Sequence, residues 1–223
     1  MKKKQLFTMV GALALVGALG IGSTLAFLQA QSSQVTNTFV VGNDLNDTDI
    51  TLDETDVDNS TPGQERDTKN NYENVQRGDV LVKDPQVHIA ANTADSRVFV
   101  KIQGLDALDA MQITADLSPD WEKVDGVDAL DGVYQYKGQL AVNGVLPSQG
   151  AAVDLTKVFT ELTVSDDADM YYTEDVVDDM GEVLHKAGDA KDVPAVLVKA
   201  IAVQEKGVTF EEALAAASAL AFE

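Results

Sequence analysis

The amino-acid sequence predicts a mainly β fold, a β-sandwich with a few peripheral helices and long acidic loops. Short stretches rich in Val, Ile, Thr and aromatic residues recur along the chain, and several alternate apolar with polar residues, which is typical of strands with one buried face. Between them lie long polar stretches; residues 53–74 are the longest and are expected to form an exposed loop. Many short strands with few helices bury their core between sheets. Composition alone does not choose a jelly-roll over an immunoglobulin-like topology.

The first 26 residues have the pattern of a secretory signal peptide. Three lysines at positions 2–4 precede an apolar run over 6–19. The small residues Thr24 and Ala26 then stand where a signal peptidase requires them if it cuts between Ala26 and Phe27. The alternative is an uncleaved membrane anchor, which needs about 20 apolar residues, more than the 14 of the run over 6–19. We therefore expect a signal peptide at 1–26, an N-terminal segment at 27–39 and one folded domain at 40–223.

Strands follow in order along the folded domain. They are expected at 39–41, 50–52, 80–82, 87–91, 97–103, 133–136, 139–142, 155–164 and 196–204. In the strand at 97–103, Val98, Val100 and Ile102 fall on one face, and Phe99 and Lys101 on the other. The strands at 133–136 and 139–142 are expected to form a hairpin. The strand at 196–204 is the most apolar and is expected near the centre of a sheet.

Three segments have helical spacing. Residues 105–111 place an apolar side chain at every third position, which favours a short helix. Residues 173–186 read as an acidic amphipathic helix with Val176, Val177, Met180 and Leu184 on one stripe. A final helix is expected to start with a capping box at 209–212.

Charge and cysteine content exclude several functions. The 223 residues carry a net charge of −21, and because the first 26 hold three lysines and no acidic residue, cleavage would lower it to −24. Nucleic acids and anionic membranes bind basic patches, so neither is an expected partner. The chain has no cysteine, which excludes thiol catalysis, thiolate zinc sites and disulfide cross-links.

The sequence gives no catalytic residue set. Its two histidines, His88 and His185, stand far apart, without the His-Glu-x-x-His pattern of a zinc protease. Calcium is the better candidate ligand, because oxygen-rich loops bind hard cations. The candidate calcium ligands lie in two acidic loops and are Asp53, Asp56, Asp58 and Asp67 in one and Asp166, Asp167 and Asp169 in the other. Neither loop has EF-hand spacing, and the alternative of a plain solvated surface stays open.

Cleavage would create a new N-terminal segment suited to pairing with a sheet edge. Residues 27–37 have no charged side chain, no Gly and no Pro, and β-prone residues gather toward their end. The candidate assembly strand comprises Phe27, Leu28, Val35, Thr36, Asn37, Thr38 and Phe39. The alternative is a frayed terminus.

Several short strings resemble the TasA/camelysin family of secreted proteins from Gram-positive bacteria. They are STLAFL at 23–28, NTFVVGN at 37–43, ITLDE at 50–54, RGD at 77–79, KDP at 83–85, SRVFVKI at 96–102 and KAIAVQ at 199–204. The resemblance covers both ends and the first half of the mature chain and is weak between about 104 and 194. It implies a jelly-roll sandwich and export through a dedicated signal peptidase, usually called SipW.

The function expected from this resemblance is structural and non-enzymatic. The protein would be secreted and would polymerise with itself into biofilm-matrix fibres, with residues 27–39 of one subunit donated as a strand to the next. An accessory or anchoring fibre protein is a further expected partner. Two alternatives stay open at this point: a camelysin-like metalloendopeptidase and a monomeric adhesive module of the cell surface.

Overall fold

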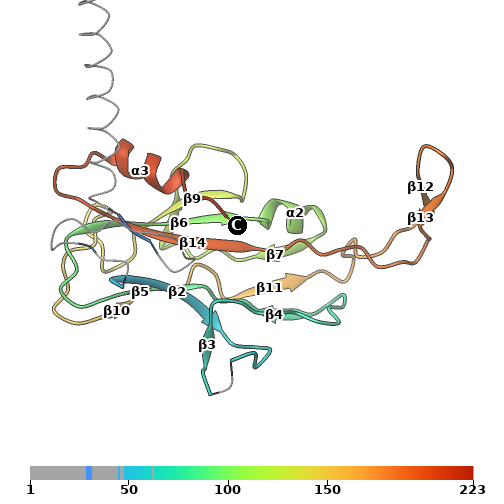
Figure 1. Cartoon of the computed structure of the whole chain (residues 1–223), viewed down its shortest axis with the longest axis horizontal. Coiled ribbons are helices and arrows are strands. Elements are labelled where there is room, and N and C mark those ends of the chain that lie inside the picture. Colours follow the sequence, from blue (N-terminus) through green and yellow to red (C-terminus); the bar gives the residue numbers. More distant parts are fainter. Residues whose placement is uncertain (1–28, 32–44, 46–47, 62, 223) are drawn as a thin grey trace, which may run out of the picture.

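The computed structural model of the protein describes residues 29–31, 45, 48–61 and 63–222. In this part the chain forms antiparallel sheets of five, four, three and two strands, together with two short helices. The sheets lie in two layers, and one hairpin projects far from them (Figure 1). The fold is therefore mainly β, as predicted. The predicted signal peptide and the strand expected at 39–41 lie outside the described residues.

The five-stranded sheet, called sheet A below, forms the upper layer in Figure 1. Its strands in spatial order are β1 (Gln29–Gln31), β14 (Leu197–Gln204), β6 (Ser96–Gln103), β9 (Gly132–Tyr136) and β8 (Trp121–Lys123). Strands β14 and β6 pair over all eight residues, from Leu197 opposite Gln103 to Gln204 opposite Ser96. This long pair is the centre of the molecule.

Two smaller sheets form the other layer. Sheet B has the order β10 (Val153–Asp154), β5 (Gln86–Ile89), β2 (Ile50–Thr55) and β3 (Arg66–Asp67). Sheet C has the order β4 (Val80–Val82), β11 (Glu161–Val164) and β7 (Ile113–Ala115). The strand order of the three sheets does not establish the jelly-roll topology that the family resemblance implies.

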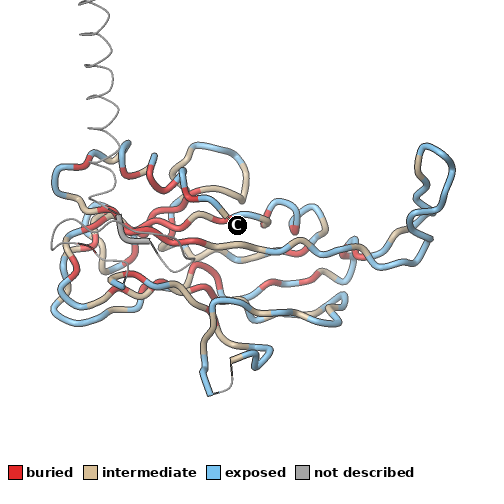
Figure 2. Tube along the Cα trace, in the orientation of Figure 1, coloured by how far each residue is buried: buried red, intermediate tan, exposed pale blue. Residues whose placement is uncertain are grey.

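The main hydrophobic core lies between the layers. Val98 and Val100 of β6 belong to one buried cluster with Ile50 and Val87 of sheet B, and each is at most 1% exposed. Buried residues occur in the strands of both layers (Figure 2). The alternation of apolar residues predicted in β6 is thus confirmed, because the partners of Val98 and Val100 come from the opposite sheet.

A second core lies on the outer face of sheet A, under helix α3 (Phe210–Ser218). Phe99 of β6 is fully buried there, with its ring 6.3 Å from that of Phe210. The capping box is confirmed: Thr209 Oγ1 accepts from the backbone N–H of Glu212, and the Glu212 carboxylate accepts from that of Thr209. Helix α2 (Leu105–Ala110) is the other described helix and confirms the prediction at 105–111. Neither helix has the length and apolar content that crossing a membrane requires.

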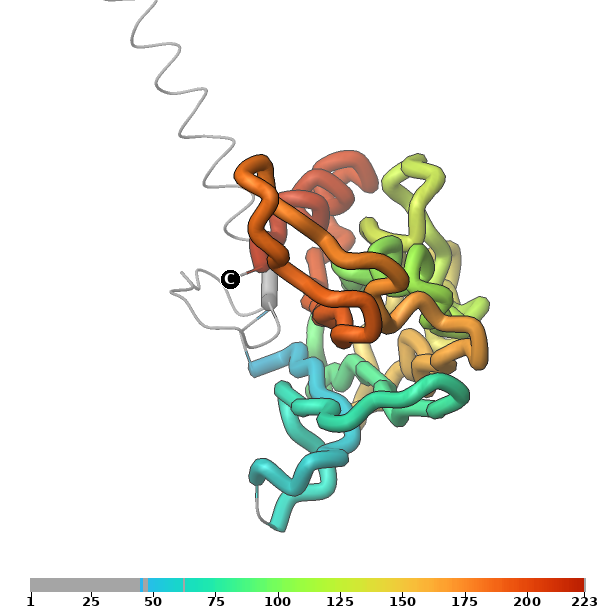
Figure 3. Tube along the Cα trace, turned by 90° about the vertical axis from the view of Figure 1, so that its right-hand side faces the viewer, coloured from blue at the N-terminus to red at the C-terminus, as the bar shows by residue number. Residues whose placement is uncertain are grey.

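The predicted helix at 173–186 is wrong. The segment forms the two-stranded hairpin β12 (Val176–Val177) and β13 (Val183–His185), which projects from the body and faces the viewer in Figure 3. Gly181 adopts a φ of 82° at the turn, and the Asp178 carboxylate accepts from the backbone N–H groups of Met180 and Glu182. Such local side-chain bonds compete with a helix. The stripe that suggested a helix is exposed, with Met180 at 84%.

Three other expectations differ from the structure. Strand β9 is not in a hairpin with 139–142, because β6 and β8 already occupy both its edges. The strand expected at 155–164 is reduced to β11, since buried side chains of the preceding loop, such as Phe159, enter the core. The loop expected at 53–74 contains the end of β2 and all of β3, and it includes Glu54, which is only 7% exposed.

Candidate functional site at the edge of sheet A

Strand β14 has one edge that is covered over part of its length. On that side β1 pairs antiparallel with it, with Gln29 opposite Val203, Ala30 opposite Ala202 and Gln31 opposite Ile201. At the other end of the strand, residues 197–199 face no described strand on this side. An uncovered strand edge offers backbone N–H and C=O groups to another strand. The edge of β14 is therefore a candidate docking site for an extended segment.

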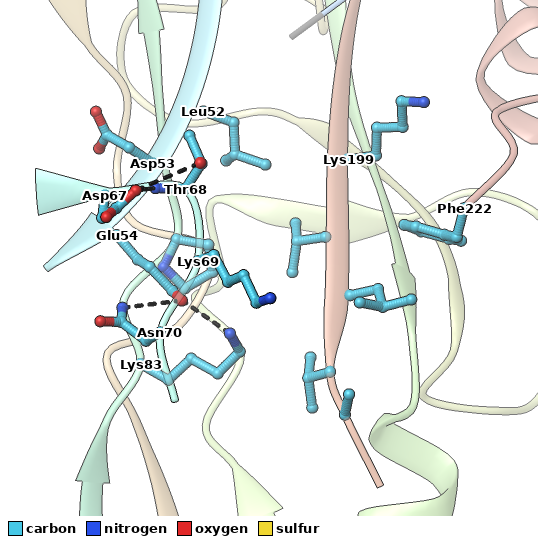
Figure 4. Close-up of a pocket in the computed structure, with 15 residues that line it drawn as sticks. Leu52, Asp53, Glu54, Asp67, Thr68, Lys69, Asn70, Lys83, Lys199 and Phe222 are labelled. Carbon is cyan, nitrogen blue, oxygen red and sulfur yellow. Dashed lines mark hydrogen bonds and ion pairs between the residues drawn. The ribbon is translucent and has the colours of Figure 1, made fainter. Parts of the chain in front are cut away.

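A groove of about 480 Å³ runs beside this edge. Residues of β2 and of the segment 67–70 line one wall, and β14 with Phe222 lines the other (Figure 4). Apolar side chains come from both walls: Leu52, Pro85, Val196, Leu197, Val198 and Phe222. The groove thus combines apolar surface with a strand edge that no other described strand covers at residues 197–199.

Two lysines hold the C-terminal segment at one end of the groove. Lys199 of β14 and Lys101 of β6 stand directly opposite each other across the strand pair. Lys101 Nζ donates to the carbonyl oxygens of Ser218 and Leu220 at 2.7 and 2.6 Å, and Lys199 Nζ donates to that of Ala221 at 3.1 Å. Cations suit the carbonyl end of a helix. The two like charges are accommodated because both point at carbonyl groups.

The polar wall of the groove is held by a buried carboxylate behind it. Asp84 is 2% exposed and accepts from the backbone N–H and Oγ1 of Thr55 at 2.7 and 2.9 Å, and Lys157 Nζ lies 2.7 Å away. Burial alone would raise the pKa of Asp84, but the bonds from Lys157 and Thr55 and the charge of Arg66 hold it below its ordinary value. Because Asp84 follows Lys83 and Thr55 follows Glu54, this network fixes the two backbones next to those side chains.

The aspartates of the first predicted calcium loop accept hydrogen bonds from neighbouring groups of the protein. Asp58 accepts from the backbone N–H groups of Ser60 and Asn71. The Ser60 side chain first, and then these backbone bonds, lower the pKa of Asp58. Asp67 accepts from Thr61 Oγ1 and from the backbone N–H of Thr68, with the same effect on its pKa. Asp56 accepts from Ser60 and Thr61.

The aspartates of the second predicted calcium loop do not converge on a common point either. Asp169 pairs with Lys191 at 2.7 Å, and the Asp167 N–H donates to Ser165. Within the described residues no three carboxylate or imidazole groups converge as a metal site would require. Calcium binding by either loop stays a prediction.

The two histidines lie in different parts of the molecule. His88 of β5 stands between two carboxylates, with Nε2 2.9 Å from Asp53 and Nδ1 2.7 Å from Asp154. Burial lowers the pKa of His88, but the bonds to Asp154 and Asp53 outweigh it, and the pKa lies above its ordinary value. His185 stacks on Tyr172 at 4.4 Å, at the base of the projecting hairpin. The imidazoles therefore share no site, and His88 has both ring nitrogens occupied.

All the residues named for the predicted cut and the predicted assembly strand lie outside the described part of the chain. These are Ala26 and Phe27 at the predicted cut, and Leu28, Val35, Thr36, Asn37, Thr38 and Phe39 of the predicted strand. Between them, Gln29–Gln31 are described and form β1. The sequence indicated a strand here but not its partner, because no pattern in the segment specifies β14.

Comparison of the chain with protein-family models, with curated proteins and with solved structures finds no match. The family resemblance therefore stays a prediction, and the geometry of the described residues carries the functional argument.

Proposed function

We propose that the protein is a secreted structural subunit that polymerises into extracellular fibres of a biofilm matrix, as the TasA/camelysin resemblance implies. Assembly would proceed by strand donation: residues 27–39 of one subunit lie along β14 of the next. The observation that carries the proposal is the pairing of Gln29–Gln31 with β14 beside a groove, where residues 197–199 have no partner strand among the described residues on that side.

The pairing within one chain supports exchange between chains. A segment that pairs with β14 of its own subunit makes backbone bonds that the same segment of a neighbour can reproduce. The contact is short, three residues against the eight of β14, so a longer donated strand would gain bonds along residues 197–199. It would also bury apolar side chains in the groove, each contributing roughly 1.5–3 kcal/mol.

Signal cleavage would control the exchange. Two residues, Phe27 and Leu28, separate the predicted cut from β1, and two residues span at most about 7 Å. Before cleavage, the signal peptide would hold β1 at the membrane. The segment could then not reach β14 of a neighbouring subunit. After cleavage the terminus is free to move.

Charge sets a second condition. Mature subunits of net charge −24 repel one another, and salt screens this repulsion over about 10 Å at 0.1 M. The proposal therefore includes faster assembly as ionic strength rises.

The proposal is tested with the mature protein and variants of the donor segment. Deleting residues 27–36, or making Val35→Asp, should leave a folded monomer that forms no fibres. Val35 and Phe39 share one face of an alternating strand, and an inward Asp would bury an unpaired charge. Thr36→Asp is the matched control, because it places the same charge on the opposite face and should still assemble. Circular dichroism reports folding, and light scattering with electron microscopy reports assembly. Normal fibres from the truncated protein would refute the proposal.

Single cysteines identify the acceptor strand, since the chain has none of its own. Ala30 and Ala202 are directly opposite in the β1–β14 register, within the range in which cross-strand side chains meet. When the Ala30→Cys and Ala202→Cys proteins are mixed during assembly and oxidised, a mixed dimer on a non-reducing gel indicates donation to β14 of another subunit. Fibres without that dimer would place the donor elsewhere.

A further inference from the structure

One wall of the groove contains a carboxylate, Glu54, that contacts both a lysine and a carboxamide. Lys83 Nζ lies 2.9 Å from Oε2 of Glu54, and Asn70 Nδ2 donates to Oε1 of the same carboxylate at 3.1 Å. The side chains of Lys83 and Glu54 are 11% and 9% exposed. Both contacts meet at Glu54 in Figure 4. The buried Glu54 carboxylate thus contacts the Lys83 amine through one oxygen and the Asn70 amide through the other.

The Asn70 amide is oriented by the backbone. Its Oδ1 accepts from the N–H of Val57 at 2.9 Å, and its Nδ2 also donates to the carbonyl oxygen of Thr55 at 2.7 Å. A backbone N–H on the carbonyl oxygen polarises Cγ toward attack and stabilises negative charge that develops on that oxygen. The bond to Thr55 holds the NH₂ group, which is the leaving group if Cγ is attacked.

We propose that the protein joins Lys83 to Asn70 by an intramolecular isopeptide bond, with Glu54 as the acid–base group that transfers the protons. The inference concerns covalent modification of a single chain and does not depend on fibre assembly.

The reaction balances without a co-reactant. Glu54 takes a proton from the Lys83 ammonium, and the neutral amine attacks Cγ of Asn70 to form a tetrahedral intermediate whose oxyanion is Oδ1. Glu54 then gives its proton to Nδ2 and receives one from the attacking nitrogen. The Cγ–Nδ2 bond breaks and ammonia leaves, taking up the proton from Glu54, so the products are a secondary amide, ammonium and the Glu54 carboxylate. Because both reacting side chains are held by the same carboxylate, their attachment to Glu54 takes the place of an external activating agent.

Among the described lysines that form ion pairs, Lys83 differs from the others because its partner carboxylate also binds a carboxamide. The others are Lys123 with Asp125, Lys137 with Glu122, Lys157 with Asp84 and Lys191 with Asp169. None of those carboxylates has a hydrogen bond to an Asn or Gln side chain in the described part of the chain. Lys137 and Glu122 are also 37% and 59% exposed, so water competes for both groups.

The bond would supply a covalent cross-link to a chain without disulfides. It would tie the segment after β3 to the segment after β4 and close residues 70–83 into a loop. A cross-link stabilises mainly by limiting the unfolded chain, and it would protect the enclosed segment from proteolysis.

Mass spectrometry of the folded protein tests the proposal. The intact mass should be about 17 Da, one ammonia, below that of the sequence. A tryptic digest should contain one branched peptide that joins residues 70 and 83, with no cleavage after Lys83. The branched peptide is essential, because succinimide formation at an asparagine also loses ammonia but leaves Lys83 open to trypsin.

Variants identify the role of each group. Lys83→Arg and Asn70→Ala should abolish the branched peptide. Glu54→Gln keeps the size of the side chain but cannot carry the proton, and should slow formation at least ~100-fold. Asn70→Asp should restore a product of the same mass, by loss of water instead of ammonia.

The matched control is Lys137→Arg, which removes an exposed ion-paired lysine and should keep the full mass loss. Circular dichroism establishes that each protein is folded. If folded wild-type protein has the full sequence mass, or loses ammonia without a branched peptide, the proposal is wrong.

Discussion

Strands β6 and β14 and strands β12 and β13 are both antiparallel pairs rich in valine, yet they differ in what covers them. The β6–β14 pair is buried on one face by sheet B and on the other by α3, and Val98, Val100 and Val203 are at most 1% exposed. The β12–β13 pair lies away from both layers, and Val177 is 53% exposed. Strand propensity therefore accounts for the local conformation of both pairs, whereas stability comes from the layer that covers one of them.

The largest expected effect is on the covered pair. Phe99→Ala should lower the free energy of unfolding by about 3–5 kcal/mol, because it removes a fully buried ring between sheet A and α3 and leaves a cavity. Urea unfolding followed by circular dichroism measures it. A loss below 1 kcal/mol would mean that α3 does not pack on sheet A as described.

A matched substitution sharpens the comparison. Val203→Ala in β14 should cost about 2 kcal/mol, because Val203 is fully buried. Val177→Ala in β12 should change the free energy of unfolding by less than about 0.5 kcal/mol, because its side chain already contacts water. The same urea titrations compare the two, and equal costs would contradict the role given to the covering layers.

A smaller, pH-dependent effect separates the two histidines, one in the body and one on the hairpin. The pKa of His88 is raised in the folded protein by Asp154 and Asp53, so protonated His88 stabilises the fold. This contribution is fully present below the ordinary pKa of about 6.5 and is lost as the pH rises through the higher pKa of the folded state.

Unfolding free energies measured across this range test the pH effect. They should fall with rising pH in the wild type and fall less in His88→Gln. His185→Gln controls for the loss of a histidine elsewhere, and the contribution of His88 is the part of the profile that the two variants do not share. Parallel profiles for wild type and His88→Gln would exclude the role of the two aspartates.

Several elements follow from the sequence because their signal is local. Alternation of apolar residues in β6 depends only on the two-residue repeat of a strand, and the capping box joins Thr209 to Glu212 three positions away. The helix predicted at 173–186 is wrong because its signal is also only local. Apolar residues at 176, 177, 180 and 184 fit a helical stripe, but the stripe has no surface to pack on, and the turn bonds of Asp178 decide the conformation.

Composition and short-range spacing are enough to specify the β class, the acidic charge, the absence of disulfides and the final helix. By contrast, the strand edge that β1 covers and the side chains that share a site follow from how distant segments pack together. Lys83, Glu54 and Asn70 come from three separate segments, and no spacing in the sequence links them. Their contact exists because the bonds from Thr55 to Asp84 bring β2 against the segment after β4. Such long-range pairing depends on the packing of the whole chain, which no local pattern encodes.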